Sequence, residues 1–152
     1  MRFLIQRVSH AEVSVENEIV GRCAKGFMIL IGICDTDTKE TADKMIRKTV
    51  NLRIFADPEG KTNLSLGDVN GSVLAVSQFT LYADIRKGNR PSFVKAGSPS
   101  YAESIYNYIL KEFRETYKIP TESGVFGAEM KIALENDGPF TVFMDSEELS
   151  RR

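Results

Sequence analysis

Histidine is almost absent from this sequence, and tryptophan is absent altogether. The 152 residues include one His, His10, and two Cys, Cys23 and Cys34. A single His excludes His-rich metal sites, and a Ser-His-Asp triad could use only His10. Two Cys are too few for a disulfide framework and indicate a reducing compartment. The chain therefore has few of the side chains on which enzymes most often depend.

An excess of charge of either sign is also missing. Lys and Arg total 20 and Asp and Glu total 21, which gives a formal net charge of −1. This balance argues against wrapping a long stretch of nucleic acid but leaves open a grip on one end of it. The longest apolar run, residues 27–34, is far shorter than the ~20 residues that span a bilayer, and the first residues do not resemble a secretory signal. We expect a cytoplasmic protein with a single domain over residues 1–152.

Apolar patterns predict a strand-rich fold. Strands are expected at residues 2–8, 12–16, 18–22, 27–33, 72–80, 128–134 and 140–144. One helix is predicted after a cap at Asp37 or Thr38, with an apolar face of Ala42, Met45, Ile46 and Val50. A second is predicted after a cap at Ser98 or Ser100, with an apolar face of Tyr101, Ile105, Tyr108, Ile109 and Phe113. Strands with two inserted helices indicate an α+β fold on an antiparallel or mixed, barrel-like sheet.

Turn residues separate these segments. Turns are predicted at His10, at residues 57–60 and at Asn70-Gly71. Residues 84–98 combine glycine, proline and basic side chains without periodicity, which is typical of an ordered functional loop.

Common cofactor and metal motifs are missing. The chain has no G-x-x-x-x-G-K-S/T, G-x-G-x-x-G, C-x-x-C or H-E-x-x-H, so we expect neither a cofactor nor a metal site. Cys23 and Cys34 lie in or beside apolar strands, where Cys usually packs as a small hydrophobic residue. A lone exposed histidine such as His10 is more often a surface residue than a catalyst.

Two short segments are less easily explained as scaffold. The apolar residues 73–76 give way to Ser77-Gln78 just before a long loop, where rigid scaffolds commonly place binding groups. A strand frayed into a turn explains that pattern equally well. Residues 136–139, Asn-Asp-Gly-Pro, indicate on their own a plain turn between two strands. A cis Gly138-Pro139 bond would fix two carbonyls that could accept hydrogen bonds from an ammonium group.

These segments resemble the two signature motifs of the D-aminoacyl-tRNA deacylases. The matching residues are 77–83, SQFTLYA, and 136–141, NDGPFT. Residues 86–93 (RKGNRPSF) and 124–130 (GVFGAEM) are also similar to that family, and residues 5–8 (IQRV) resemble its first strand. The resemblance spans essentially the whole chain in the expected order. One position departs: Phe140 stands where the family commonly has Val, which places a bulky ring beside the Gly-Pro turn.

The resemblance implies an enzyme that hydrolyses the ester between a D-amino acid and the terminal adenosine of tRNA. It also implies removal of glycine from mischarged tRNA(Ala), and a homodimer of α+β barrel-like subunits with active sites at the interface. In the family the loop at Gly138-Pro139 enters the partner's pocket and holds the α-ammonium, so that an L side chain collides with it. Glycine has no side chain to collide and remains a substrate. Arg7 is assigned the support of this loop through its multiple donors.

The resemblance also assigns roles within the pocket. Thr80 would act with Ser77, Gln78 and the backbone N–H groups of Phe79 and Thr80, which are candidate oxyanion donors. No His or acidic residue in 77–81 could activate Thr80, so we favour water attack assisted by the ribose hydroxyl over an acyl-Thr80 intermediate. Substrate-binding walls are assigned to Phe79, Phe126 and Met130, and tRNA phosphate contacts to Arg86, Lys87, Arg90 and Lys95.

Two other functions fit the same residues. A non-catalytic module that binds RNA ends would keep the basic loop and the aromatic side chains. A small interaction protein would use the Gly138-Pro139 turn only to shape a dimer interface.

Overall fold

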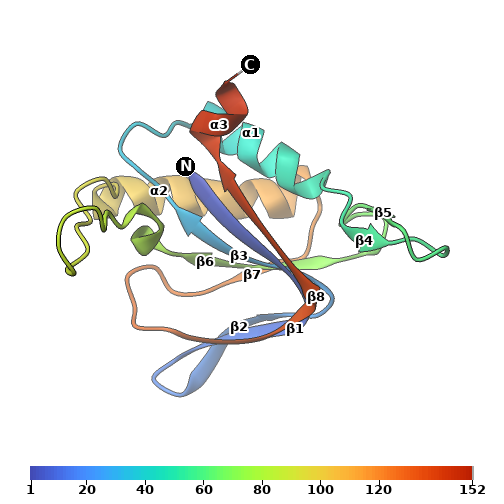
Figure 1. The fold of residues 1–152 in the computed structure, drawn as a ribbon. Coiled ribbons are helices and arrows are strands. Elements are labelled where there is room, and N and C mark those ends of the chain that lie inside the picture. Colours follow the sequence, from blue (N-terminus) through green and yellow to red (C-terminus); the bar gives the residue numbers. More distant parts are fainter. Residues whose placement is uncertain (152) are drawn as a thin grey trace.

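A mixed sheet of six strands forms the centre of the fold, and two helices cover one of its faces (Figure 1). This computed structural model describes residues 1–151. The sheet contains β1 (Arg2–Val15), β2 (Glu18–Cys23), β3 (Gly26–Gly32), β6 (Ser72–Ser77), β7 (Thr121–Ser123) and β8 (Lys131–Asp145). The other elements are α1 (Lys39–Val50), a small hairpin of β4 (Phe55–Ala56) and β5 (Thr62–Leu64), a 3-10 turn (Phe79–Tyr82), α2 (Pro99–Lys111), a π-helical turn (Glu112–Thr116) and α3 (Ser146–Ser150).

β1 is the long strand around which the sheet curls. It pairs with β3 through residues 2–8 and with β2 through residues 11–15, while β8 runs antiparallel along most of its length. β3 and β6, and β6 and β7, are parallel pairs, so the sheet is mixed. In the strand order β2-β1-β3-β6-β7, the first and last strands approach each other. Gly21 of β2 lies so near β7 that a Cβ on it would stand 2.5 Å from the carbonyl oxygen of Ser123. The sheet is therefore an almost closed barrel.

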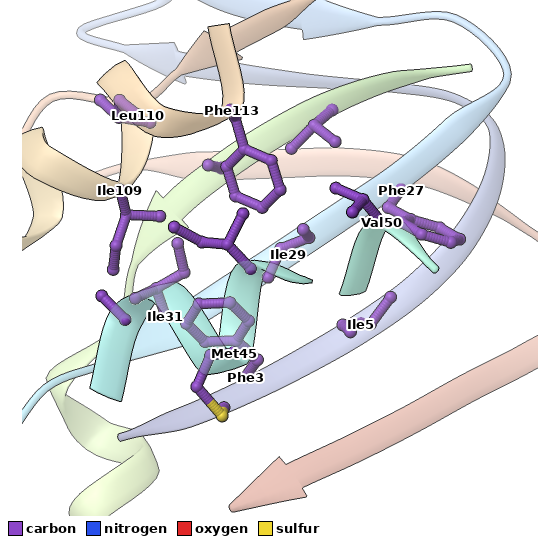
Figure 2. Close-up of a cluster of buried hydrophobic side chains, with 14 of the residues drawn as sticks. Phe3, Ile5, Phe27, Ile29, Ile31, Met45, Val50, Ile109, Leu110 and Phe113 are labelled. Atoms are coloured by element: carbon purple, nitrogen blue, oxygen red, sulfur yellow. The ribbon is translucent and has the colours of Figure 1, made fainter. Parts of the chain in front are cut away.

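The main core lies between the sheet and the two helices (Figure 2). Alternate residues of β1 and alternate residues of β3 meet the apolar faces of α1 and α2 there. Its members include Phe3, Ile5, Phe27, Ile29, Ile31, Met45, Ile46, Tyr106, Ile109 and Phe113. Each large apolar side chain contributes about 1.5–3 kcal/mol when fully buried. The predicted apolar faces of both helices are thus the buried ones, with Tyr101 and Tyr108 at their margin.

The helix starts distinguish between the predicted caps. Thr38 caps α1, because its hydroxyl accepts a hydrogen bond from the Thr41 N–H and the Thr41 hydroxyl accepts one from the Thr38 N–H. Asp37 is instead buried and accepts the N–H of Cys34 at 2.8 Å. Ser98 precedes α2, but its hydroxyl donates to Asp35 at 2.9 Å rather than capping the helix. Among residues 1–151 no helix is long and apolar enough to cross a membrane.

The two strands predicted near the N-terminus are not separate. Residues 2–8 and 12–15 belong to one strand, β1, which ends before Glu16, and His10 lies inside it opposite Glu135 rather than in a turn. β1 runs through this region without a break because it is paired along both edges. Along one edge β3 pairs with its first half and β2 with its second half, and β8 pairs along the other edge.

The C-terminal strand predictions are corrected by the same long-range pairing. β8 is one strand that begins at Lys131, so Ala128 to Met130 precede it. Residues 136–139 do not reverse the chain. Gln6 pairs with Thr141 and Val8 with Asn136, so the four residues 137–140 form a bulge opposite Arg7 alone.

Candidate active site

The strand β6 ends at Ser77, not at residue 80 as predicted, and the chain enters the 3-10 turn. The Gln78 N–H donates to the carbonyl of Ile31 at 2.7 Å, so the end of β3 fixes where the turn begins. Gly32 allows the turn to pack against β3, because a Cβ there would lie 3.0 Å from the Cβ of Leu81. The abrupt change to polar residues after Val76 therefore marks a tight turn held on the sheet.

The 3-10 turn presents a hydroxyl beside free backbone donors. The Thr80 side chain is exposed, and the Gln78 amide Nε2 donates a hydrogen bond to its Oγ1. Within the described residues, the N–H groups of Phe79 and Thr80 donate to no protein acceptor. Two unused donors beside a positioned hydroxyl are the arrangement that stabilises a developing oxyanion.

A cavity of about 530 Å³ opens beside this turn. Ser77, Gln78 and Phe79 line it, as do Phe126 and Met130 from the segment before β8. Phe79 is 56% exposed and meets Phe93 edge to face, with ring centroids 5.1 Å apart. Thr80 does not line the cavity itself and is connected to it through Gln78. The structure thus brings together five of the residues predicted from the sequence.

The back wall of the cavity is held by packing. Phe126 lies against the buried Tyr106, with ring centroids 5.9 Å apart. Met130 packs its sulfur on the Cα of Gly124, where any Cβ would overlap it. Phe126 and Met130 are only half-buried, so each presents one side to the cavity and the other to the core.

The bulge at residues 137–140 is organised around Arg7. The Arg7 guanidinium donates from Nε to the Asp137 carbonyl at 3.0 Å and from Nη1 to the Ile54 carbonyl at 2.6 Å. It also lies 5.0 Å from the centroid of the Phe140 ring. The unusual Phe140 therefore packs against the residue that supports the bulge. Gly138-Pro139 is a cis peptide, and both residues are exposed.

The bulge and the cavity are separate in one protomer. None of residues 136–140 lines the cavity beside the 3-10 turn. The single chain therefore brings the Ser77–Phe79 group together with Phe126 and Met130 but does not bring Gly138-Pro139 to them.

The predicted basic cluster is partly neutralised by a residue that sequence reasoning missed. Arg86 donates from Nε to Asp84 at 2.9 Å, and the Lys95 Nζ lies 3.9 Å from the same carboxylate. Hydrogen bonds from Arg86 hold the pKa of Asp84 far below its usual range. Lys87 and Arg90 are exposed and form no ion pair within the described residues. The Asp84-Ile85-Arg86 spacing at the start of the loop is the sequence feature that could have predicted this ion pair.

Comparison with known proteins shows the family to which the chain is related. The family model described as D-Tyr-tRNA(Tyr) deacylase matches residues 4–145. The chain belongs to this family. A D-aminoacyl-tRNA deacylase of Thermosipho melanesiensis is 47% identical over 149 residues, covering 98% of this chain and 99% of that protein. Another, from Syntrophomonas wolfei subsp. wolfei, is 50% identical over 149 residues with the same coverage.

Two solved structures have the same fold as this chain. A structure titled "c-Myc DNA Unwinding Element Binding Protein" superposes with a TM-score of 0.90 at 39% identity and covers 95% of this chain and 98% of that one. A structure titled as a probable eukaryotic D-amino acid tRNA deacylase has a TM-score of 0.81 at 21% identity over 94% of this chain and 97% of that one, and supports the fold alone. The predicted α+β, barrel-like deacylase fold with two main helices is confirmed.

Proposed function

We propose that this protein hydrolyses the ester between a D-amino acid and the terminal adenosine of tRNA. The observation that carries the proposal is the family match over residues 4–145, with relatives of nearly equal length that are named D-aminoacyl-tRNA deacylase. The reaction adds water across the ester bond and releases the free D-amino acid and the tRNA. The enzyme is thus a hydrolase that recycles mischarged tRNA.

The 3-10 turn supplies the chemistry of this reaction. The free N–H groups of Phe79 and Thr80 would donate to the oxygen that becomes negative when water attacks the ester carbon. Thr80 Oγ1 is oriented by Gln78, and among residues 1–151 no carboxylate or imidazole forms a hydrogen bond with it. A Thr nucleophile needs such a base. The adjacent ribose hydroxyl of the substrate therefore assists the water, and Thr80 positions it.

Stereoselectivity is assigned to the backbone at Gly138-Pro139. Its carbonyls would accept hydrogen bonds from the substrate α-ammonium, with Arg7 holding the bulge in place through the Asp137 carbonyl. With the ammonium and the ester fixed, a D side chain points to open space and an L side chain meets the bulge. Rejection of L in this way does not depend on the type of D side chain. It also accepts glycine, so glycyl-tRNA(Ala) is a second substrate.

Catalysis of this kind requires two subunits. Gly138 and Pro139 are exposed and lie outside the cavity of their own chain, so a partner's cavity is the place for them to act. β8 is 15 residues long and pairs only with β1 among the described strands, and Phe143 on it is 49% exposed. A long strand with a free edge and an exposed aromatic ring is a surface suited to pairing with another chain. We therefore propose a homodimer with active sites at its interface.

The tRNA end is gripped by aromatic and basic side chains. Phe79 and Phe126 line the cavity and would stack on the terminal adenine, at about 1–3 kcal/mol per stacked base. The loop residues Arg86, Lys87, Arg90 and Lys95 would contact phosphates of the acceptor end. A local patch of this kind acts without a basic net charge.

The test is a paired deacylation assay with D-Tyr-tRNA and L-Tyr-tRNA, followed by glycyl-tRNA(Ala). We expect catalytic amounts of protein to release D-Tyr and glycine and to leave the L-ester intact. Persistence of the D-ester while the protein still binds tRNA would support a non-catalytic RNA-end-binding module instead. If Gly138 substitutions disrupt assembly without any effect on stereoselectivity, the turn serves only the dimer interface.

A further inference from the structure

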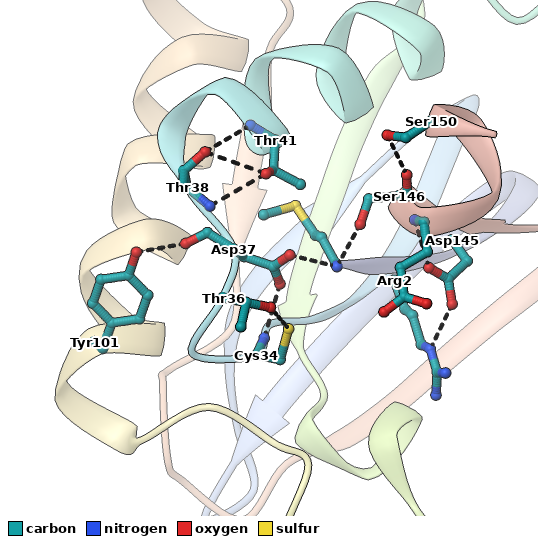
Figure 3. A network of polar contacts seen from close by, with 12 residues as sticks. Arg2, Cys34, Thr36, Asp37, Thr38, Thr41, Tyr101, Asp145, Ser146 and Ser150 are labelled. Carbon is teal, nitrogen blue, oxygen red and sulfur yellow. Dashed lines mark hydrogen bonds and ion pairs between the residues drawn. The ribbon is translucent and has the colours of Figure 1, made fainter. Parts of the chain in front are cut away.

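Arg2 stands where three parts of the fold meet. It is the first residue of β1 and pairs in register with Gly32 on β3 and with Asp145 at the end of β8. The 3-10 turn packs over Gly32, so the Arg2 side chain reaches the turn from the neighbouring strand. Figure 3 shows Arg2 extending beside Asp145 at this end of the sheet.

The Arg2 guanidinium connects the turn to the sheet through three contacts. Its Nη1 donates to the carbonyl of Leu81 at 2.8 Å, and its Nε donates to Asp145 Oδ2 at 2.9 Å. Its central carbon lies 4.5 Å from the centroid of the Tyr82 ring. The planar fork of Arg is the side chain that can serve a carbonyl, a carboxylate and an aromatic face at once.

Asp145 is itself fixed, so the connection is anchored. Its Oδ1 accepts the N–H of Glu147 at 2.9 Å and caps α3, while Oδ2 accepts from Arg2. The Asp145 side chain is 12% exposed and that of Arg2 31% exposed, which limits the competition from water. Leu81 is the next residue after Thr80 in the same turn, so a hydrogen bond to the Leu81 carbonyl restrains the backbone close to the Thr80 hydroxyl.

We propose that Arg2 and Asp145 are positioning residues for the catalytic turn. The pair holds the Leu81 peptide so that Thr80 and the free N–H groups keep their geometry during ester hydrolysis. This inference rests on the proposed function, because it assigns that turn the chemistry. Neither side chain lines the cavity beside the turn, so the pair acts on turnover through the turn and not on substrate affinity.

The first test separates kcat from KM with D-Tyr-tRNA as substrate. Arg2→Ala should lower kcat by about 10- to 100-fold, the range expected from a displacement of about 1 Å, and leave KM within about twofold. Arg2→Lys, which offers a single donor group, should restore part of kcat. The matched control is Arg47→Ala, an exposed arginine of α1, which should match wild type. An unchanged kcat in Arg2→Ala, measured well below its melting temperature, would overturn the proposal.

The second test asks whether Arg2 and Asp145 act as one unit. In a double-variant cycle, Arg2→Ala combined with Asp145→Asn should be no slower than Arg2→Ala alone. Losses in kcat that multiply would mean that the two residues act separately. If Arg2→Ala folds poorly, the same double-variant cycle is measured with Arg2→Lys and Asp145→Asn.

A third measurement does not depend on the reaction. Hydrogen exchange at the Leu81 and Ala83 amides, which bond to Gln78 and Thr80 within the turn, should quicken in Arg2→Ala and not in Arg47→Ala. Unchanged exchange would refute the positioning role even in an active enzyme. If exchange quickens but wild type leaves D-Tyr-tRNA intact, the proposed function fails and Arg2 only holds the turn.

Discussion

The guanidinium of Arg7 lies directly against the Cα of Gly138. A Cβ at Gly138 would stand 2.7 Å from Arg7 Nη2 and 3.3 Å from the Phe140 nitrogen. Gly138 also has a φ of +123°, which side chains rarely tolerate. The residue that would face the substrate ammonium is therefore restricted to glycine by its own backbone and by its neighbour.

Gly138→Ala should consequently slow deacylation of D-Tyr-tRNA by at least about tenfold, because Arg7 must move and the bulge with it. The strained φ should also cost about 1–3 kcal/mol of stability. Deacylation rates and thermal melts measure the two effects.

The matched control for Gly138→Ala is Gly60→Ala. Gly60 also has a positive φ, +79°, but nothing lies within 4 Å of a Cβ built there. This variant should lose some stability and keep full activity. Equal loss of activity in both variants would show that destabilisation, and not the contact with Arg7, is responsible.

Local sequence patterns predicted most elements of this fold but not the pairing between distant strands. Thr38 and the apolar face from Ala42 to Val50 identify α1, because capping and helical spacing are local properties. Asn-Asp-Gly-Pro is typical of a turn, yet Asn136 stays paired with Val8 and residues 137–140 form a bulge inside β8. Pairing with β1, more than 120 residues earlier in the chain, determines that this segment is a bulge and not a turn, because Arg7 of β1 donates a hydrogen bond to the Asp137 carbonyl.

The same distinction applies to the candidate site. The polar break after Val76 indicated a candidate binding segment, although the strand was predicted to run to residue 80 and the 3-10 turn was not predicted. The family resemblance supplied Phe126 and Met130 as neighbours of this segment. Arg2 went unnoticed because nothing local connects it with Leu81, 79 residues away. Gly32, inside an apolar strand, was the one available sign of a close approach at that point.

Burial makes Cys23 a source of pH dependence at alkaline pH. Loss of solvation raises the pKa of its thiol from an ordinary 9.0 to about 11. A raised pKa in the folded state stabilises the protein below pH 9, and this contribution is lost as the pH rises towards 11. Its upper limit is about 3 kcal/mol.

Cys23→Ala should therefore flatten the fall in unfolding free energy between pH 9 and pH 11. Denaturant titrations of wild type and variant measure the difference, in which the other titrating groups cancel. Parallel curves for wild type and Cys23→Ala would contradict the prediction.

The basic loop should contribute unequally to tRNA binding. A phosphate must compete with Asp84 for Arg86 and Lys95, whereas Lys87 and Arg90 form no ion pair with any of residues 1–151. The double variant Lys87→Ala/Arg90→Ala should make the negative slope of log binding constant against log salt concentration shallower by about 1–2, since each phosphate contact contributes about 0.7–0.9. Arg86→Ala with Lys95→Ala should lower it less. Equal slopes for the two double variants would contradict this order.

Asp84→Asn provides the opposite change in the same loop. Asparagine leaves the backbone bridge between residues 84 and 92 in place and removes the carboxylate. Arg86 and Lys95 are then available to phosphate, so tRNA should bind more tightly at low salt and the salt slope should steepen. Weaker binding of this variant would mean that the ion pairs serve to shape the loop.

Replacement of Thr80 distinguishes the two routes of hydrolysis. Because Thr80 Oγ1 has Gln78 and no base beside it, we expect Thr80→Ala to slow D-Tyr-tRNA hydrolysis but to keep measurable turnover. Abolished turnover, together with a trapped ester on wild-type Thr80, would establish an acyl-enzyme instead. Thr116→Ala, an exposed threonine outside the site, is the control and should match wild type.

The substrate offers the complementary test. A tRNA that ends in 2′-deoxyadenosine and carries D-Tyr on its 3′-hydroxyl lacks the group that would assist the water. Wild type should hydrolyse this ester at least about 100-fold more slowly, the lower end of what general acid–base catalysis contributes. Thr80→Ala and the deoxy substrate should act together less than multiplicatively, because both disturb the same water. An unchanged rate on the deoxy substrate would exclude assistance by the ribose and return the role of activating the water to the protein.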